Sequence, residues 1–169
     1  MADLKWLDKY SGESTEELIS LEGKYRTDSL VVAFEQALEQ KIERLGEESL
    51  TREEHVILVI EALEREVNNG GFELLFINSS KRYASLFTEA LELIGCTETA
   101  NLTRQAIDIL GIREPISVEA IDRVMEQENE EREKKLGECD DRYYQIAGDL
   151  SIPLFEFIKK NRDKITLKD

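Results

Sequence analysis

Carboxylate side chains are the groups in this chain whose type and spacing could do the most chemistry. No apolar residue occurs between Glu126 and Lys135, and acidic residues continue beyond that gap. Closely spaced carboxylates can act as general acid and base, but in an acidic, helix-forming chain such pairs also arise from composition alone. We therefore interpret this segment as a surface, whose candidate partner-binding residues are Glu126, Glu128, Glu130, Glu131, Glu138, Asp140 and Asp141.

A run of charges is most often one solvated face of a helix. Pairs four residues apart, such as Glu128 with Arg132 and Glu131 with Lys135, support that interpretation because opposite charges attract at this helical spacing. The stretch without apolar residues corresponds to roughly 15 Å of helix at about 1.5 Å per residue. This segment must either project from the rest of the domain or lie on its surface fully solvated. The functional alternative is an acidic face that a basic protein recognises.

The only histidine, His55, lacks neighbours with which it could do chemistry. Its helical neighbours include Leu58 and Val59, which cannot complete a metal site. The sequence contains no HExxH motif, Cys/His cluster, nucleophile elbow, phosphate-binding loop or dinucleotide-binding fingerprint. We therefore expect a protein without enzymatic activity, with no metal ion and no cofactor.

Two amides and two glycines interrupt a helical stretch at residues 68–71. The side chains of Asn68 and Asn69 could bind a ligand by hydrogen bonds, but at a helix end they more simply satisfy freed backbone groups. A ligand pocket around these amides and Tyr143 is the alternative. Of the pair Tyr143 and Tyr144, we expect one ring in the core and the other at a rim, with its hydroxyl in water.

Helices must position these groups, because only two prolines and nine glycines interrupt a chain dominated by helix-forming residues. Capping boxes at Ser14–Glu17 and Thr51–Glu54 predict two helix starts. The amides at 68–69 predict a helix end, with a short helix following over 72–77. Gly95 and Gly111 predict the ends of two further helices that form a hairpin.

At 169 residues the chain has the length of one domain of ordinary size, and two domains would be cramped. We predict an all-α, single compact domain over residues 1–169, with about seven to nine helices for a chain of this length. The apolar spacing near the carboxyl end predicts a helix over residues 152–165 that packs on the rest of the domain.

Global charge narrows the class of partner. The net charge is -15 and the isoelectric point is about 4.6, so the surface repels nucleic acid and anionic lipid and attracts basic proteins. Solubility alone is the simpler explanation of this charge. Two distant cysteines, no signal-peptide pattern at the amino terminus and no apolar run of membrane-spanning length lead us to expect a cytoplasmic protein with reduced thiols.

The density of negative charge can be compared with that of DNA. Duplex DNA carries one negative charge per about 1.7 Å of axis, whereas a helix presents a given face once per turn of about 5.4 Å. Two acidic ridges, or two protomers of a homodimer, would therefore be needed to match a duplex. The sequence offers a second ridge in Glu39, Glu43, Glu47, Glu48, Glu53, Glu54, Glu61 and Glu64, and a smaller one in Glu13, Glu16, Glu17 and Glu22.

The stretch Glu66-Val67-Asn68-Asn69-Gly70-Gly71-Phe72, with Asn78-Ser79-Ser80 behind it, resembles the hallmark of the DMP19-like family, or DUF4375 domain. The segment from Leu136 to Tyr144, with acidic residues before a tyrosine pair, is similar to the family's second characteristic segment. The resemblance covers about residues 28–150 and implies an all-helical fold. Its structural motif here would be Asn68, Asn69, Gly70, Gly71, Phe72 and Asn78.

The same family includes a bacterial DNA mimic, whose carboxylates imitate backbone phosphates and occupy the DNA-binding surface of a transcription factor. The resemblance therefore implies a bacterial regulator of transcription that acts through protein–protein contacts and does not bind nucleic acid or membranes. The motif specifies the fold and says little about the partner. The alternative is an immunity-type protein that neutralises a toxin through its acidic surface.

Overall fold

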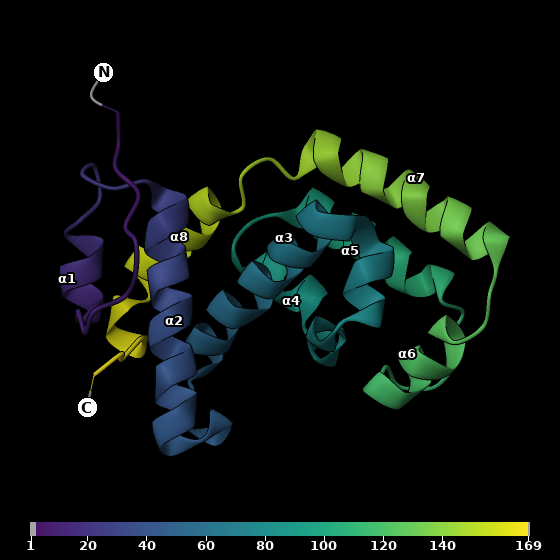
Figure 1. Ribbon diagram of the computed structural model, residues 1–169, viewed down its shortest axis with the longest axis horizontal. Coiled ribbons are helices and arrows are strands. Elements are labelled where there is room, and N and C mark those ends of the chain that lie inside the picture. The colour runs from purple at the N-terminus through teal and green to yellow at the C-terminus, as the bar shows by residue number, and fades with distance from the viewer. Residues whose placement is uncertain (1–2, 169) are drawn as a thin grey trace. The chain divides into compact units, whose positions relative to one another are not determined.

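The computed structural model describes residues 3–168, which form eight α-helices and three short 3-10 helices (Figure 1). Within this range the only β-type pairing consists of isolated bridges at Tyr25, and no strand forms. The predicted all-α fold and its helix count are confirmed. The helices group into two compact units, one of residues up to Glu61 with those from Asp149 onward, the other Ala62–Gly148. A single domain over 1–169 stays a prediction, and residues 1, 2 and 169 lie outside the described residues.

The first unit is built around helix α2. It contains α1 (Thr15–Ile19), α2 (Thr27–Leu45), η1 (Glu47–Ser49), the first part of α3 (Arg52–Ile77), α8 (Ser151–Lys160) and η3 (Arg162–Lys164). Helix α2 contacts α1, η1 and α8, and Figure 1 shows α8 beside α2. The carboxy-terminal helix ends at Lys160, short of residue 165, and the chain continues through η3.

Both predicted capping boxes form in this unit. The Ser14 hydroxyl accepts a hydrogen bond from the Glu17 N–H, and the Glu17 carboxylate accepts one from the Ser14 N–H. Thr51 and Glu54 make the same reciprocal pair at 3.1 and 3.0 Å. Because each pair satisfies amides that a helix start leaves free, α1 and α3 begin where the sequence predicts.

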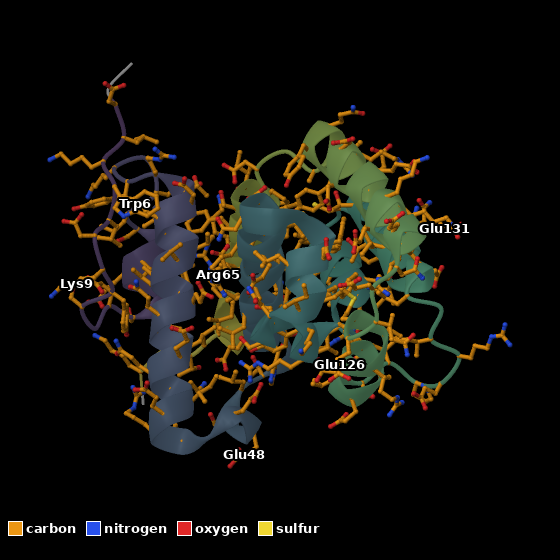
Figure 2. All side chains as sticks on the ribbon, turned by 45° about the vertical axis from the view of Figure 1, so that its right-hand side comes forward. Trp6, Lys9, Glu48, Arg65, Glu126 and Glu131 are labelled. Atoms are coloured by element: carbon orange, nitrogen blue, oxygen red, sulfur yellow. The ribbon has the colours of Figure 1, made fainter. Side chains whose placement is uncertain are left out.

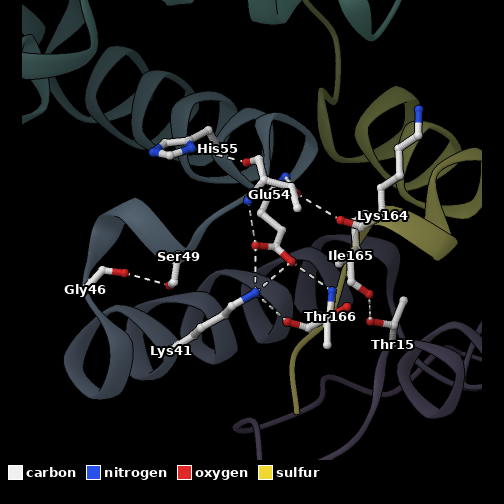
Figure 3. A network of polar contacts seen from close by, with 10 residues as sticks. Thr15, Lys41, Gly46, Ser49, Glu54, His55, Lys164, Ile165 and Thr166 are labelled. Atoms are coloured by element: carbon white, nitrogen blue, oxygen red, sulfur yellow. Dashed lines mark hydrogen bonds and ion pairs between the residues drawn. The ribbon is translucent and has the colours of Figure 1, made fainter. Parts of the chain in front are cut away.

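Glu54 is also the centre of a buried polar network (Figure 3). Its side chain is 0% exposed, and its carboxylate accepts hydrogen bonds from Lys41 Nζ at 2.9 and 3.0 Å and from the Thr166 N–H at 2.8 Å. Lys41 Nζ also donates to the Thr166 carbonyl at 2.9 Å. The network therefore fixes the carboxy-terminal segment, in which Ile165 and Leu167 are buried, to α2 and to the start of α3.

The second unit holds the family-like segments. It contains the remainder of α3, η2 (Ser79–Tyr83), α4 (Phe87–Leu93), α5 (Thr97–Ile109), α6 (Val118–Met125) and α7 (Glu130–Ile146). Helix α5 contacts both α4 and α7. The predicted hairpin of α4 and α5 is confirmed, and the glycine after each helix, Gly95 and Gly111, has a positive φ of 84° and 67°.

Helix α3 is broken at the two glycines of the motif. Gly70 has φ -163° and ψ 20°, and Gly71 has φ 74° and ψ -171°, so neither residue is helical. This break confirms the predicted end of the first helix, and the second piece of α3 is the short helix predicted to follow it.

The stretch without apolar residues is not one continuous helix, contrary to the sequence-based expectation. Helix α6 ends at Met125, and α7 begins at Glu130 after a turn. Asn129 caps α7, because its side-chain oxygen accepts a 3.0 Å hydrogen bond from the Arg132 N–H. No glycine or proline marks this turn, and Asn129 is the sequence signal that could have revealed it.

Candidate partner-binding surface

Helix α7 has one buried face and one exposed face. Its buried residues Arg132, Leu136, Cys139 and Tyr143 recur at three or four residues, the spacing of a single helical face. Helix α5 packs against α7, so the acidic residues between those positions are turned away from the interior of this unit. The sequence pattern of α7 therefore assigns separate faces to packing and to carboxylates.

Six of the seven candidate partner-binding residues are exposed, and together they form what we call the acidic surface. They come from the α6–α7 turn and from α7, where Figure 2 labels Glu126 and Glu131. From residue 126 to residue 141 the chain carries eight carboxylates against three basic side chains. The members of the acidic surface are Glu126, Glu128, Glu130, Glu131, Glu138 and Asp141.

Arg132 does not neutralise this surface, although it lies in the middle of the acidic segment. The expected ion pair with Glu128 is wrong, because the Arg132 side chain points inward and is only 7% exposed. Its Nη1 and Nη2 donate to the carbonyls of Val124 and Gln127 at 3.1 and 2.7 Å. Arg132 therefore satisfies carbonyls at the end of α6, and the exposed carboxylates keep more of their charge.

Part of the acidic character has a structural explanation. Glu130, Glu131 and Glu133 lie in the first turn of α7, where negative side chains interact favourably with the positive end of the helix dipole. The predicted ion pair of Glu131 with Lys135 is confirmed at 3.0 Å. Helix stability thus accounts for carboxylates at the start of α7 but not for those at Glu138 and Asp141.

Asp140, the seventh candidate, is half-buried and has a structural role. Its Oδ1 accepts a 2.8 Å hydrogen bond from the Phe72 N–H, just after the break in α3. One turn along α7, the Tyr144 hydroxyl donates to the Val67 carbonyl at 2.7 Å, just before the break. Helix α7 therefore satisfies a backbone donor on one side of the break and an acceptor on the other.

Gly71 is the residue that lets Asp140 approach. Its φ of 74° lies in the left-handed region that favours glycine, and an added Cβ would stand 2.2 Å from Asp140 Oδ2. A side chain at this position would therefore meet both backbone strain and a direct clash. At Gly70, by contrast, an added Cβ would meet the flexible Leu74 side chain at 2.7 Å.

Glu66 joins the two parts of the motif. Its buried carboxylate accepts hydrogen bonds from Asn78 Nδ2 and from the Ser80 hydroxyl, both at 2.9 Å. Asn78 is also the residue before η2. The Glu66 carboxylate therefore fixes the chain that follows the short second piece of α3.

The tyrosine pair divides into one buried and one exposed ring as predicted, but the Tyr144 hydroxyl, which was expected in water, donates to the Val67 carbonyl. Tyr143 is 2% exposed and packs edge-on against Phe72 with ring centroids 5.8 Å apart, whereas Tyr144 is 54% exposed. Burial raises the pKa of Tyr143, and the nearby Glu64 carboxylate raises it further. Asn68 and Asn69 are exposed. The amides and Tyr143 therefore do not line one open pocket, which argues against the ligand pocket considered above.

The other acidic ridges are weaker than the sequence suggests. In the first unit, the carboxylates of Glu16, Glu17 and Glu22 pair with the basic carboxy-terminal residues Arg162, Lys168 and Lys159 at 3.1, 3.4 and 2.8 Å. Within the larger ridge, Glu54 and Glu61 are buried. The acidic surface on α7 and its preceding turn is therefore the better candidate for contact with a partner.

The described part of the chain shows no constellation of metal ligands. Residues 3–168 contain no group of three or more His, Cys, Asp and Glu side chains arranged to hold a metal ion. His55 Nδ1 lies 3.2 Å from the Thr51 carbonyl, and its Nε2 lies 3.7 Å from Glu47. None of the helices formed by these residues combines the length and the apolar character that crossing a membrane requires.

Comparison with known proteins gives one match. A family model described as DMP19-like protein matches residues 48–161. This range begins later and ends later than the resemblance seen in the sequence, and it contains the whole of the second unit. Neither the comparison with curated proteins nor that with solved structures found a match.

Proposed function

Because the chain belongs to the DMP19-like protein family, we propose that it acts by binding, without catalysis, and that its acidic surface occupies the DNA-binding surface of a transcription factor or another DNA-binding protein. The observation that carries this proposal is the inward turn of Arg132, which leaves the carboxylates of the α6–α7 turn and of α7 outermost. Such a partner would place the activity in the cytoplasm of a bacterium.

The spacing of the carboxylates is compatible with this partner class. The eleven-residue step from Glu130 to Asp141 corresponds to about 16 Å of helix, a length over which one DNA strand carries about five phosphates. Five exposed carboxylates lie in that step, at positions 130, 131, 133, 138 and 141. A single helix does not reproduce two strands, so we propose that a homodimer supplies the second acidic ridge.

Asp140 is unsuitable for testing this surface, because its carboxylate holds the Phe72 N–H. The better variant reverses Glu128, Glu138 and Asp141 to lysine, since all three are exposed and lie outside the first turn of α7. The matched control reverses Asp8, Glu43 and Glu48, which are exposed residues of the first unit, and so changes the net charge equally.

The experiment begins with capture of partners from the native host and their identification by mass spectrometry. Binding of each variant to the purified partner is then measured at about 50 mM and about 200 mM salt, together with displacement of the partner from a DNA duplex. We expect the α7 variant to lose at least about tenfold in affinity and the control to lose far less.

Equal losses in the two variants would contradict the assignment of the surface. A captured toxin enzyme that binds no DNA would favour the immunity-type alternative and contradict DNA mimicry. Light scattering of the free protein tests the homodimer, because a monomer at the concentrations used for binding would leave only one acidic ridge.

A further inference from the structure

The second unit contains a pocket of about 690 Å³ that the proposed function does not use. It lies among the end of α5, the connection from α5 to α6, helix α6 and the α6–α7 turn. Its apolar wall includes Leu110, Ile112 and Val124, and its cationic groups are Arg113, Arg123 and Arg132. Three arginines around one hollow are unexpected in a chain whose net charge is -15.

Arg132 lines this pocket and is only 7% exposed, and no carboxylate among residues 3–168 forms an ion pair with it. Its guanidinium donates to two neutral carbonyls, and its buried Nε has no hydrogen-bond partner among residues 3–168. A buried cation without an anion is costly. The negative end of the α6 dipole, equivalent to about half a charge, compensates Arg132 only in part.

Arg123 already forms an ion pair with one carboxylate in this pocket, that of Glu114. Both side chains line the pocket and are exposed, and Arg123 Nη2 donates to Glu114 Oε1. This exposed ion pair contributes little to stability, and a bound anion could replace it. The Glu114 carboxylate therefore competes with any anionic ligand for Arg123.

We propose that this pocket binds a small organic anion, with a carboxylate or phosphate group toward Arg123 and Arg132 and an apolar body along Leu110, Ile112 and Val124. Guanidinium groups match the geometry of carboxylate and phosphate oxygens, and ligand pockets typically combine an apolar lining with a few polar groups. No member of the acidic surface lines this pocket, although both include residues of the α6–α7 turn, and the ligand class of the pocket does not depend on the proposed function.

The test uses the full chain, isotopically labelled, with phenyl phosphate as the probe and inorganic phosphate and phenol as comparisons. Backbone amide shifts are followed by NMR during each titration. Phenyl phosphate should shift the amides of Ile112, Val124 and Gln127 and should bind more tightly than either comparison compound, because only this probe engages both the cationic groups and the apolar wall.

Arg123→Gln should weaken phenyl phosphate binding about tenfold, the loss expected for one charged hydrogen bond. Arg142→Gln is the matched control, because Arg142 is an exposed arginine of α7 that donates to Gln105 and does not line the pocket. It should change the affinity by less than about twofold. Glu114→Gln should tighten binding, since it removes the competing carboxylate.

Three results would overturn the proposal: no saturable shifts with phenyl phosphate, equal losses in the Arg123 and Arg142 variants, or weaker binding by Glu114→Gln. Equal affinity for phenol and phenyl phosphate would also overturn it, because an apolar hollow would then explain the binding. None of these variants alters the acidic surface, so failure here is distinguishable from failure of the proposed function.

Discussion

The carboxylate of Asp140 accepts a 2.8 Å hydrogen bond from the backbone N–H of Phe72, 68 residues earlier in the chain. Phe72 begins the second piece of α3, so the carboxylate occupies the place that an N-cap side chain usually takes. Its negative charge also faces the positive end of that helical piece. The N-terminus of a helix is usually capped by a side chain of the same segment, whereas the second piece of α3 is capped by a side chain of α7.

Gly71→Ala should be strongly destabilising, by about 2.5–6 kcal/mol. The backbone conformation at φ 74° and ψ -171° is nearly restricted to glycine and costs an alanine about 1–3 kcal/mol, and displacement of Asp140 removes a charged hydrogen bond that contributes about 1.5–3 kcal/mol. Urea unfolding followed by circular dichroism measures the loss. Gly95→Ala is the matched control, because Gly95 has φ 84° but open space around an added Cβ. Equal losses in the two variants would show that the approach of Asp140 adds nothing.

Asp140→Asn tests the charge of this contact. Burial raises the pKa of Asp140, the Phe72 N–H lowers it in part, and Asp141 raises it further. The Asp140 carboxyl therefore binds a proton more readily in the folded chain than in the unfolded chain. Its contribution to stability decreases as the pH rises from about 3.8, the ordinary pKa of an aspartate, through the raised pKa of the folded chain. Asparagine keeps an acceptor oxygen but does not titrate.

The free energy of unfolding of the wild type, relative to Asp140→Asn, should therefore be larger at about pH 4 than at about pH 7. Denaturant unfolding of both proteins at the two pH values measures this difference. A difference that grows with rising pH would mean that the Phe72 N–H outweighs burial and holds the pKa below its ordinary value.

The two neighbouring tyrosines should respond in opposite ways to loss of the hydroxyl. Tyr144→Phe removes the 2.7 Å hydrogen bond to the Val67 carbonyl and should cost about 1 kcal/mol. Tyr143→Phe should be neutral or stabilising, because the Tyr143 hydroxyl is buried without a partner among the described residues. Thermal unfolding of the two variants gives the comparison, and a large loss for Tyr143→Phe would indicate an ordered water at that hydroxyl.

Lys41→Met should cost about 3–5 kcal/mol, because it leaves the buried Glu54 carboxylate without its cation. The double variant Lys41→Met, Glu54→Leu should recover part of that loss but not all of it, since Glu54 also caps α3 and holds Thr166. Urea unfolding of the single and double variants provides the values. A double variant less stable than Lys41→Met would mean that capping outweighs the removal of an unpaired charge.

Local sequence was sufficient for the helix starts and for the break in α3. Ser14 and Thr51 cap helices through groups only a few residues away, and the glycines at 70 and 71 permit the break through their own backbone conformations, so these patterns are visible in the sequence. The turn at 126–129 was missed because a single asparagine marks it. Because this turn was not predicted, the four-residue spacing also led to the wrong ion pair of Arg132 with Glu128.

The candidate site depended more on contacts distant in sequence. In the sequence, Asp140 is indistinguishable from the other carboxylates of the acidic segment. Only the contact of α7 with the break in α3 shows that it binds the Phe72 N–H. The pairs of Glu16 with Arg162 and Glu22 with Lys159 join opposite ends of the chain. Composition indicates how many charges exist, but only tertiary structure shows which carboxylates remain available to a partner.

The two-faced character of α7 has an evolutionary consequence. Its inward side chains are constrained by the backbone groups and rings that they contact, whereas the exposed carboxylates of Glu138 and Asp141 form no hydrogen bond or ion pair among residues 3–168. Substitutions on the outer face are therefore tolerated far more readily than those on the inner face. Partner choice can therefore change along the outer face of α7 while its inner face keeps its contacts with both sides of the break in α3.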